Sequence, residues 1–339
     1  MIARAAGEMS GNASRVRPRV TGSEVGEALR PRLMFRMWLM FVRRGVTGPC
    51  SRVKKCSMKD TIMNSQVWRQ MHVNGAQIEF RDEGSGQAVV FVHGAMGEEC
   101  TAVLADPVWT TGYRVIHYHR RGYGNSTRPE APVTMAQQCN DCLALLRHMG
   151  VQRAHFVGQS YGAVIILQII KDAPEVVHTA ALLEPALPSV MADFPEFTSA
   201  VGRALSLYQS GDKRAAMDVF AGAVVGSDVP AEVDRSFREK YFEVWVRDAD
   251  SVCQSDLPAL GEWNFTADDA RSVKQPVLNV MGAHTPPFFR EVHSRLQSWL
   301  PDAENVVVPG VSHPLLQMDP RGMAQRLASF CRKHPLTPL

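Results

Sequence analysis

The sequence has 339 residues, of which 45% are hydrophobic and 21% are charged, as in ordinary globular domains. Its formal net charge of +3 is unevenly distributed, because residues 1–57 carry a balance of +9 and residues 58–339 a balance of −6. The acidic remainder excludes the broad basic surface that a nucleic-acid-binding protein needs, so no nucleic-acid partner is expected.

Residues 1–66 precede the regular part of the sequence and are rich in arginine but poor in acidic residues. The apolar run at residues 33–42 is interrupted by Arg36 and is shorter than the roughly 20 residues that span a bilayer. We therefore expect no integral membrane segment here. The extension is predicted to be disordered or to reflect a start assigned too far upstream, and an organelle-targeting role is the alternative.

A regular alternation of strand and helix patterns begins at about residue 67. Residues 70–84 predict a hairpin, because two alternating stretches are joined at Asn74-Gly75, a strong turn signal. Further strands are predicted at residues 88–94, 113–119, 153–159, 179–185, 275–282 and 304–310. Helices are predicted at residues 132–150, 161–173, 287–300 and about 319–332.

Strands that alternate with helices predict a mainly parallel sheet with right-handed crossovers. Residues 186–270 interrupt the alternation, because they contain amphipathic helical segments but no clear strand. We expect this interval to be an inserted helical unit that covers one end of the sheet. The predicted organisation is therefore an extension at residues 1–66, a core formed by residues 67–185 and 271–333, and a helical insertion at residues 186–270.

The segment Gly158-Gln159-Ser160-Tyr161-Gly162 lies between an apolar strand and an apolar helix. A G-x-S-x-G sequence in this context is typical of a nucleophile elbow, in which a tight turn exposes the serine hydroxyl. The following helix directs its N-terminal N–H groups towards the site and favours negative charge there. Ser160 is therefore the candidate nucleophile.

Two backbone N–H groups are candidates for an oxyanion hole, the pair of donors that stabilises a tetrahedral intermediate. One belongs to Ala95, which follows the predicted strand that contains His93, and the other belongs to Tyr161. Met96 replaces Ala95 as the candidate if the loop is shifted by one residue. We interpret His93 as a brace for this loop and the polar loop at residues 119–126 as structural.

A serine hydroxyl needs a base to remove its proton near neutral pH, and histidine is the usual base. His313 follows the last predicted strand, at the edge of the parallel sheet where Ser160 lies and where ligands bind in such folds. Among the alternatives, His72 lies in a strand, whereas His148 and His155 flank a connection at the opposite edge. His313 is therefore the candidate base.

The sequences HGAMG, RRGYGNS, GQSYG and GVSHP occur in this order and together resemble the α/β-hydrolase superfamily over residues 67–333. The resemblance implies an α/β fold with a mainly parallel eight-stranded sheet flanked by helices, and a helical cap formed by the insertion. It also implies that Ser160 is the nucleophile and His313 the general base. Ala95 and Tyr161 are the implied oxyanion donors. The serine distinguishes the chain from the branches that use an aspartate nucleophile.

The carboxylate of such a triad most often lies in the loop after the strand at residues 275–282, but Thr285 occupies that position. Glu184 ends the neighbouring predicted strand. Neighbouring strand ends lie about 5 Å apart, so its side chain can reach the same histidine. We predict Glu184 as the triad acid, and a Ser–His dyad or a carboxylate from the cap are the alternatives.

The predicted function is hydrolysis of a carboxylic ester or a related small acyl substrate through an acyl-enzyme, with no metal or organic cofactor. A cofactor-free perhydrolase or a C–C bond hydrolase would use the same triad. A non-catalytic ligand-binding protein on this fold is a further alternative, because Thr285 replaces the usual acid. The seven scattered cysteines favour a reducing compartment, so we expect a cytoplasmic protein or, through the extension, an organelle-targeted one. No metal or redox site is expected at Cys139 and Cys142.

Overall fold

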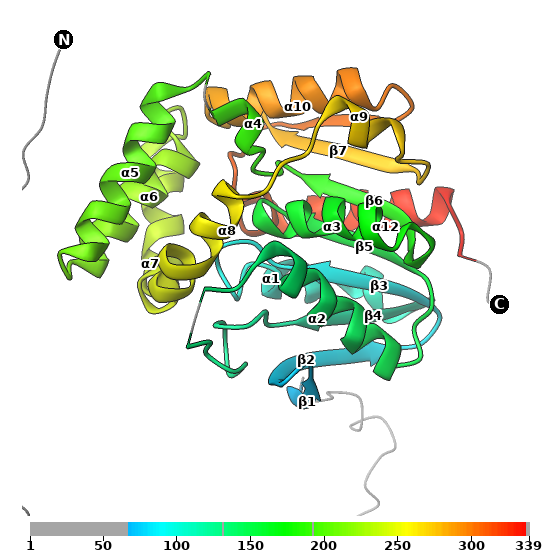
Figure 1. Ribbon diagram of the computed structural model, residues 1–339. Coiled ribbons are helices and arrows are strands. Elements are labelled where there is room, and N and C mark those ends of the chain that lie inside the picture. Colours follow the sequence, from blue (N-terminus) through cyan, green and yellow to red (C-terminus); the bar gives the residue numbers. More distant parts are fainter. Residues whose placement is uncertain (1–66, 131, 192, 337–339) are drawn as a thin grey trace, which may run out of the picture. The chain divides into compact units, whose positions relative to one another are not determined.

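The computed structural model describes residues 67–130, 132–191 and 193–336, so the predictions for residues 1–66 lie outside the described residues. An eight-stranded sheet of order β1-β2-β4-β3-β5-β6-β7-β8 forms the centre of the fold (Figure 1). The strands are β1 (Arg69–Val73), β2 (Ala76–Gly84), β3 (Gln87–Val92), β4 (Tyr113–Tyr118), β5 (Ala154–Gln159), β6 (Val177–Leu183), β7 (Val277–Gly282) and β8 (Glu304–Val308).

The predicted mainly parallel sheet is confirmed, and among the described strands its antiparallel part is the edge formed by β1 and β2. β1 pairs with β2 and β2 pairs with β4 in antiparallel registers, whereas the other neighbouring pairs are parallel. Asn74 and Gly75 connect β1 to β2, and their φ angles of 47° and 76° fit the predicted tight hairpin. The parallel strands therefore direct their carboxyl ends to one edge of the sheet.

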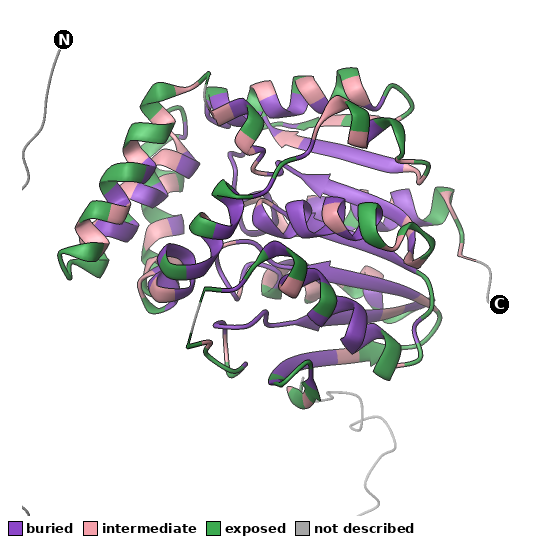
Figure 2. Ribbon diagram, viewed as in Figure 1, coloured by how far each residue is buried: buried purple, intermediate pink, exposed green. Residues whose placement is uncertain are grey.

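Helices cover both faces of the sheet (Figure 1). One face carries α2 (Met135–His148), α3 (Tyr161–Asp172) and α10 (Pro287–Trp299), and the other carries α1 (Thr101–Leu104), η1 (Pro107–Thr110), α11 (Leu315–Met318) and α12 (Pro320–Lys333). The short turn η2 (Pro174–Val176) leads into β6. Figure 2 shows the strands buried between these layers. No described helix is both long and apolar enough to cross a bilayer.

The sequence of β3 explains why two hydrophobic cores form. Val90 and Val92 pack into the core under α2 and α3, whereas Val89 and Phe91 pack into the core under α1 and α12. Successive side chains of a strand point to opposite faces, so a continuous apolar run requires cover on both sides. The strand and the two helical layers therefore follow from one sequence pattern.

Residues 186–270, here called the helical insertion, contain no strand among the residues that the structure describes. The elements between β6 and β7 are α4 (Pro188–Met191), α5 (Pro195–Gln209), α6 (Lys213–Val225), α7 (Ala231–Ser251), the π-helical turn η3 (Val252–Asp256), α8 (Leu257–Gly261) and α9 (Ala267–Arg271). Figure 1 shows α5, α6 and α7 beyond the end of the sheet to which the arrows of β6 and β7 point.

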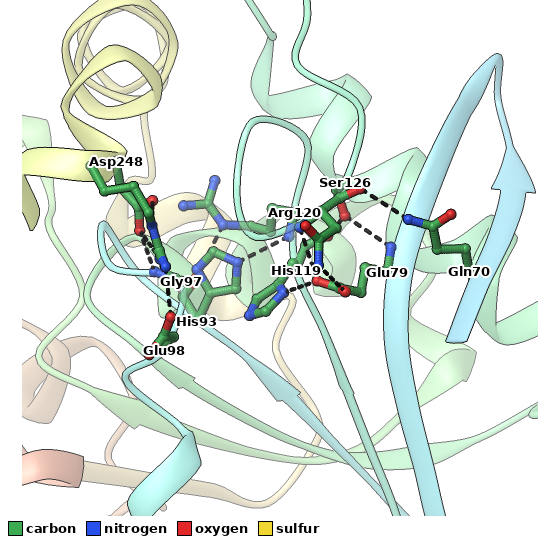
Figure 3. Close-up of polar contacts among 11 residues, drawn as sticks. Gln70, Glu79, His93, Gly97, Glu98, His119, Arg120, Ser126 and Asp248 are labelled. Atoms are coloured by element: carbon green, nitrogen blue, oxygen red, sulfur yellow. Dashed lines mark hydrogen bonds and ion pairs between the residues drawn. The ribbon is translucent and has the colours of Figure 1, made fainter. Parts of the chain in front are cut away.

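Buried polar contacts attach the helical insertion to the loops that follow β3 and β4. The guanidinium of Arg120 donates two hydrogen bonds to the Asp256 carboxylate, at 2.9 and 2.7 Å. The Gly97 N–H donates to Asp248 at 3.1 Å (Figure 3). Both carboxylates are buried, so each contact replaces water that the charge would otherwise hold. These contacts position α7 and η3 over the ends of the strands.

Candidate active site

Ser160 lies in the sharp turn between β5 and α3. Its φ of 54° and ψ of −119° are strained values for a residue with a side chain, as a nucleophile elbow requires. The Ser160 N–H donates to the Leu183 carbonyl at 2.8 Å, which ties the turn to the end of β6. A Cβ atom at Gly158 would lie only 2.6 Å from the Gly162 carbonyl carbon, so the tight turn needs glycine.

Glu184 follows the last residue of β6 and is also held in a left-handed conformation, with a φ of 47°. Its N–H donates to the Val280 carbonyl of β7 at 3.1 Å. Its side chain is 1% exposed, and Oε1 accepts a hydrogen bond from the Gly282 N–H at 2.7 Å. The unusual backbone therefore turns the carboxylate towards the end of the next strand.

Thr285 contributes to this arrangement as a hydrogen-bond donor. Its hydroxyl donates to Oε2 of Glu184 at 2.8 Å, and its side chain is completely buried. The loop after β7, which has no carboxylate of its own at this position, thus helps to hold the carboxylate of the neighbouring strand. The Gly282 N–H and the Thr285 hydroxyl therefore each pair with one oxygen of the buried carboxyl group.

The structure brings Glu184 and His313 together. His313 Nδ1 lies 2.7 Å from Oε2 of Glu184, and the imidazole is 5% exposed. The ring of Phe289 stacks on the imidazole at a centroid distance of 3.8 Å. Because Nδ1 donates its hydrogen to the carboxylate, Nε2 is left as the proton-accepting nitrogen.

Ser160 and His313 line the same small cavity, which has a volume of about 20 Å³. Ala95 and Met96 line it as well, so the two alternative loop residues both reach the site. Tyr161 is the first residue of α3, and the first N–H groups of a helix have no acceptor within the helix. The five residues singled out for catalysis or oxyanion binding thus lie at one edge of the sheet. Glu184 does not line the cavity itself and reaches it through His313.

Arg120 orients the Ala95 peptide and was missed by the sequence analysis. Its guanidinium donates to the Gly94 carbonyl at 2.6 Å. It also donates to the His93 carbonyl at 3.2 Å (Figure 3). The Gly94 carbonyl and the Ala95 N–H belong to one planar trans peptide and point in opposite directions. A bond that fixes this carbonyl therefore also fixes the direction of the Ala95 N–H.

His93 braces the start of the same loop (Figure 3). Its Nε2 accepts a hydrogen bond from the Arg120 N–H at 2.9 Å, and its Nδ1 lies 2.9 Å from the Gly94 carbonyl. Burial lowers the pKa of His93 well below its ordinary value, and the nearby Arg120 lowers it further. The ring is therefore neutral, with one nitrogen accepting and the other donating.

Glu79 on β2 fixes the loop at residues 119–126 (Figure 3). Its Oε2 lies 2.7 Å from His119 Nδ1. Arg121 pairs instead with Asp141 on α2, at 2.5 Å. These contacts hold the two residues on either side of Arg120, in keeping with a structural role for the loop.

Glu99 was also missed by the sequence analysis, although it lines the cavity beside the serine. Its Oε1 accepts a hydrogen bond from the Gly94 N–H, and its Oε2 lies 3.4 Å from Gln159 Nε2. Burial raises the pKa of Glu99 to about 8. Nothing in the sequence GEEC distinguishes this residue from Glu98, which pairs with Arg247 near the surface.

Comparisons with known proteins identify the fold. The family model described as the alpha/beta hydrolase fold matches residues 87–318. The chain is 24% identical over 274 residues to a non-heme haloperoxidase from Rhodococcus erythropolis, covering 76% of this chain and 96% of that protein. It is 26% identical over 250 residues to an uncharacterized carboxylesterase from Bacillus subtilis, covering 71% and 78% of the two chains.

A solved structure shows the same fold. The bromoperoxidase from Bacillus anthracis aligns with a TM-score of 0.65 and 20% sequence identity, over 78% of this chain and 100% of that chain. The resemblance identified from the four sequence motifs is confirmed by the match to the family model. The chain belongs to the α/β-hydrolase fold family and is an α/β-fold hydrolase.

Proposed function

We propose that this hydrolase cleaves carboxylic esters or related small acyl substrates through an acyl-enzyme formed at Ser160. The observation that carries the proposal is a paired carboxylate and imidazole, Glu184 and His313, beside a strained serine. The similarity to a protein named as a carboxylesterase adds support for ester substrates. The three side chains have the roles of acid, base and nucleophile in this proposal.

In the first step, His313 Nε2 takes the hydroxyl proton of Ser160 while the serine oxygen attacks the ester carbonyl. The N–H groups of Ala95 and Tyr161 stabilise the negative oxygen of the tetrahedral intermediate. The protonated imidazole then donates its proton to the leaving alcohol, and Glu184 stabilises the cation in the meantime. Water attacks the acyl-enzyme in the second half of the reaction, with the same groups in the same roles.

We further propose that the helical insertion acts as a cap over Ser160. Phe220 and Val224 on α6 and Trp245 on α7 line the cavity beside the serine. The cavity volume of about 20 Å³ is enough for about one water molecule. Larger acyl groups therefore require these side chains to move, which favours short acyl chains as substrates.

Perhydrolysis is a second candidate activity, favoured by the similarity to a protein named as a non-heme haloperoxidase. Hydrogen peroxide would replace water in the attack on the acyl-enzyme, and the product would be a peroxyacid. Comparing peroxyacid formation from an acetate ester and peroxide with ester hydrolysis in water distinguishes the two activities.

The cysteines support the proposal of a reducing, cytoplasmic location. Those in the described residues are free and buried: Cys100, Cys139, Cys142, Cys253 and Cys331. Burial raises the pKa of Cys142 to about 12 and also raises that of Cys139, so neither thiol is ionised at neutral pH. This agrees with the interpretation of these two residues as neighbours on α2 rather than as a redox pair.

A fluorophosphonate probe is expected to label Ser160, because such probes react with serines that a neighbouring histidine activates. The intact mass should increase by one probe, and peptide sequencing should place the adduct on Ser160. The His313→Ala variant should react far more slowly, and the unfolded protein should not react. An unlabelled native protein would contradict the acyl-enzyme proposal and favour a non-catalytic ligand-binding protein.

Arg120→Lys is expected to lower kcat by up to about 10²-fold with little change in KM, because the Ala95 N–H donates mainly in the transition state. Lysine keeps a positive charge for the buried Asp256 but lacks the planar fork that reaches the Gly94 carbonyl. The measurement is steady-state kinetics on an activated ester. Arg121→Lys is the matched control, since Arg121 pairs with Asp141 away from the cavity. An equal loss in both variants would contradict the orienting role of Arg120.

A further inference from the structure

Three polar side chains other than His313 line the cavity beside Ser160: Glu99, Gln159 and Gln317. The orientation of the Gln159 amide is fixed, because its Oε1 accepts a hydrogen bond from the Leu316 N–H at 3.0 Å. Its Nε2 therefore faces the other two side chains, with Glu99 Oε2 at 3.4 Å and Gln317 Oε1 at 3.3 Å. This contact in turn fixes the Gln317 amide with its oxygen towards Gln159.

Because the Gln317 oxygen faces Gln159, the NH₂ group of Gln317 is left without an acceptor. Gln317 Nε2 is buried and has no hydrogen-bond partner among the described residues, and the same holds for Trp245 Nε1. The two side chains are only 8% and 6% exposed, and both line the cavity that contains Ser160. Buried N–H groups without a partner are rare, because each has lost its water without a replacement. Two such groups at one cavity indicate that an acceptor binds there.

Glu99 adds a third polar group with hydrogen-bonding capacity. Its Oε1 accepts from the Gly94 N–H, so the carboxyl is anchored to the loop that carries the oxyanion donor Ala95. Burial raises the pKa of Glu99 to about 8, and Asp256 raises it as well, whereas the Gly94 N–H, Arg120 and Gln159 lower it. The carboxyl is therefore largely protonated at neutral pH and can donate a hydrogen bond.

We infer that Trp245, Gln317 and Glu99 form a polar subsite for a neutral oxygen atom on the acyl chain of the substrate. The inference rests on the proposed acyl-enzyme function and names its substrate class: short acyl groups that carry an ether, carbonyl or hydroxyl oxygen. A hydrocarbon acyl group would leave the buried donors unpaired, and sites of this kind reject such analogues strongly. A carboxylate is disfavoured, because the buried cation Arg120 is already paired with Asp256.

The test compares p-nitrophenyl esters whose acyl chains have the same length and differ by one oxygen. Methoxyacetate is matched with butanoate, and 3-methoxypropanoate with pentanoate. For each pair, kcat/KM for the oxygen-bearing ester is divided by kcat/KM for the hydrocarbon ester. This ratio is then divided by the ratio of the rates at which hydroxide hydrolyses the same two esters, which corrects for their different intrinsic reactivity. For at least one pair the wild type is expected to prefer the oxygen-bearing ester by about 100-fold, roughly tenfold for each of two hydrogen bonds.

Two variants remove the donors one at a time. Trp245→Phe keeps an aromatic ring without the N–H, and Gln317→Leu keeps the size of the side chain without the amide. Each is expected to reduce the preference for the oxygen-bearing ester about tenfold, because one hydrogen bond to that oxygen is lost. Since the effect is a ratio of two substrates in one protein, partial loss of folded protein cancels.

Trp263→Phe is the matched control. Trp263 is as buried as Trp245, but its Nε1 already donates to Gln168 at 2.7 Å, and it does not line the cavity. This variant should lose stability and keep the full preference for the oxygen-bearing ester. The subsite would be overturned if the corrected kcat/KM ratio of the wild type were near one for both pairs. It would also be overturned if Trp263→Phe reduced the preference for the oxygen-bearing ester as much as Trp245→Phe does.

Binding to the Ser160→Ala variant separates the subsite from the proposed chemistry. Calorimetry with the matched esters should show about 100-fold tighter binding of the oxygen-bearing member, reduced about tenfold when Trp245→Phe is added. If the wild type hydrolyses neither ester and this difference in binding is still found, the subsite stands and the acyl-enzyme proposal falls. Equal binding of both esters overturns the subsite, whether or not the wild type hydrolyses them.

Discussion

On the proposed mechanism, Ser160→Ala is expected to lower kcat on an activated ester by about 10⁶-fold, the effect that removing the nucleophile of a serine protease triad has. The variant lacks the oxygen that attacks the ester carbonyl. The Ala95 and Tyr161 N–H groups would still polarise that carbonyl, but only the slow direct attack of water remains. The fold should be unaffected, because alanine is smaller and the turn is held by the Ser160 N–H bond to Leu183. The measurement is the burst and steady-state release of p-nitrophenol by purified protein.

Ser255→Ala is the matched control for this variant. Ser255 is also buried and lies in η3, but it is not among the residues that line the cavity. Its hydroxyl accepts a weak hydrogen bond from the Val133 N–H at 3.4 Å, so its loss should change turnover little. Retention of more than a small fraction of turnover in Ser160→Ala, with the burst intact, would exclude Ser160 as the nucleophile.

Most of the fold could be predicted because the strands of the sheet are buried on both faces. A run such as that at Val89–Val92 has only one stable environment, a strand covered by two layers of helices. The order of the strands was harder to predict from the sequence. β4 lies between β2 and β3 in the sheet, and this order depends on contacts between residues far apart in the sequence. The insertion was predicted to be helical as a whole, without the bounds of its individual helices.

Candidate residues that directly follow a strand could be placed from the sequence. Ser160, Glu184 and His313 each follow a strand of the parallel sheet, so the order of elements alone gathers them at one edge. The role of Thr285 was anticipated only in part. From the sequence, Thr285 was identified only as the residue at the usual position of the acid, whereas in the structure its hydroxyl donates to the carboxylate of Glu184.

Arg120 and Glu99 could not be predicted, because their environments depend on distant residues. Arg120 lies 136 residues before its partner Asp256, and its two carbonyl acceptors belong to a different loop. In the sequence it is one of two adjacent arginines, and its neighbour Arg121 pairs with Asp141 instead. Only the three-dimensional contacts distinguish the arginine that reaches the cavity loop from the one that stabilises the fold.

The contacts of Arg120 also connect the helical insertion to the loop that carries the Ala95 N–H. Both Nη1 and Nη2 of its guanidinium donate to Asp256 in η3, and Nη2 also donates to the Gly94 carbonyl. The nearby bond from Gly97 to Asp248 on α7 joins the same loop to the same insertion (Figure 3). Movement of the helical insertion would therefore be transmitted to the peptide that carries the Ala95 N–H.

Glu184→Gln is expected to lower kcat by roughly 10⁴-fold, the effect seen when a triad carboxylate becomes an amide. The Glu184 carboxylate accepts from three donors, of which the Gly282 N–H is fixed in the backbone and cannot reverse its direction. The oxygen of the glutamine would therefore face Gly282, and its NH₂ group would face His313. Nδ1 of the imidazole would then have to accept, which places the hydrogen on Nε2 and blocks proton transfer from Ser160.

Kinetics of this variant on an activated ester, with two control variants, separate the charge from the hydrogen bonds. Thr285→Val removes one donor to the carboxylate but leaves the charge and the His313 tautomer, so turnover should fall by no more than about tenfold. Glu291→Gln makes the same chemical change on α10, where Glu291 pairs with Arg295 near the surface, and should leave turnover unchanged.

If Glu184→Gln retains turnover within about tenfold of the wild type, Glu184 is not the acid, and a Ser–His dyad or a carboxylate of the cap takes its place. Both variants disturb the same hydrogen-bond network, but only Glu184→Gln reverses the direction of the bond to His313 Nδ1. If kcat falls far more in Glu184→Gln than in Thr285→Val, the effect is therefore due to the tautomer and charge of His313.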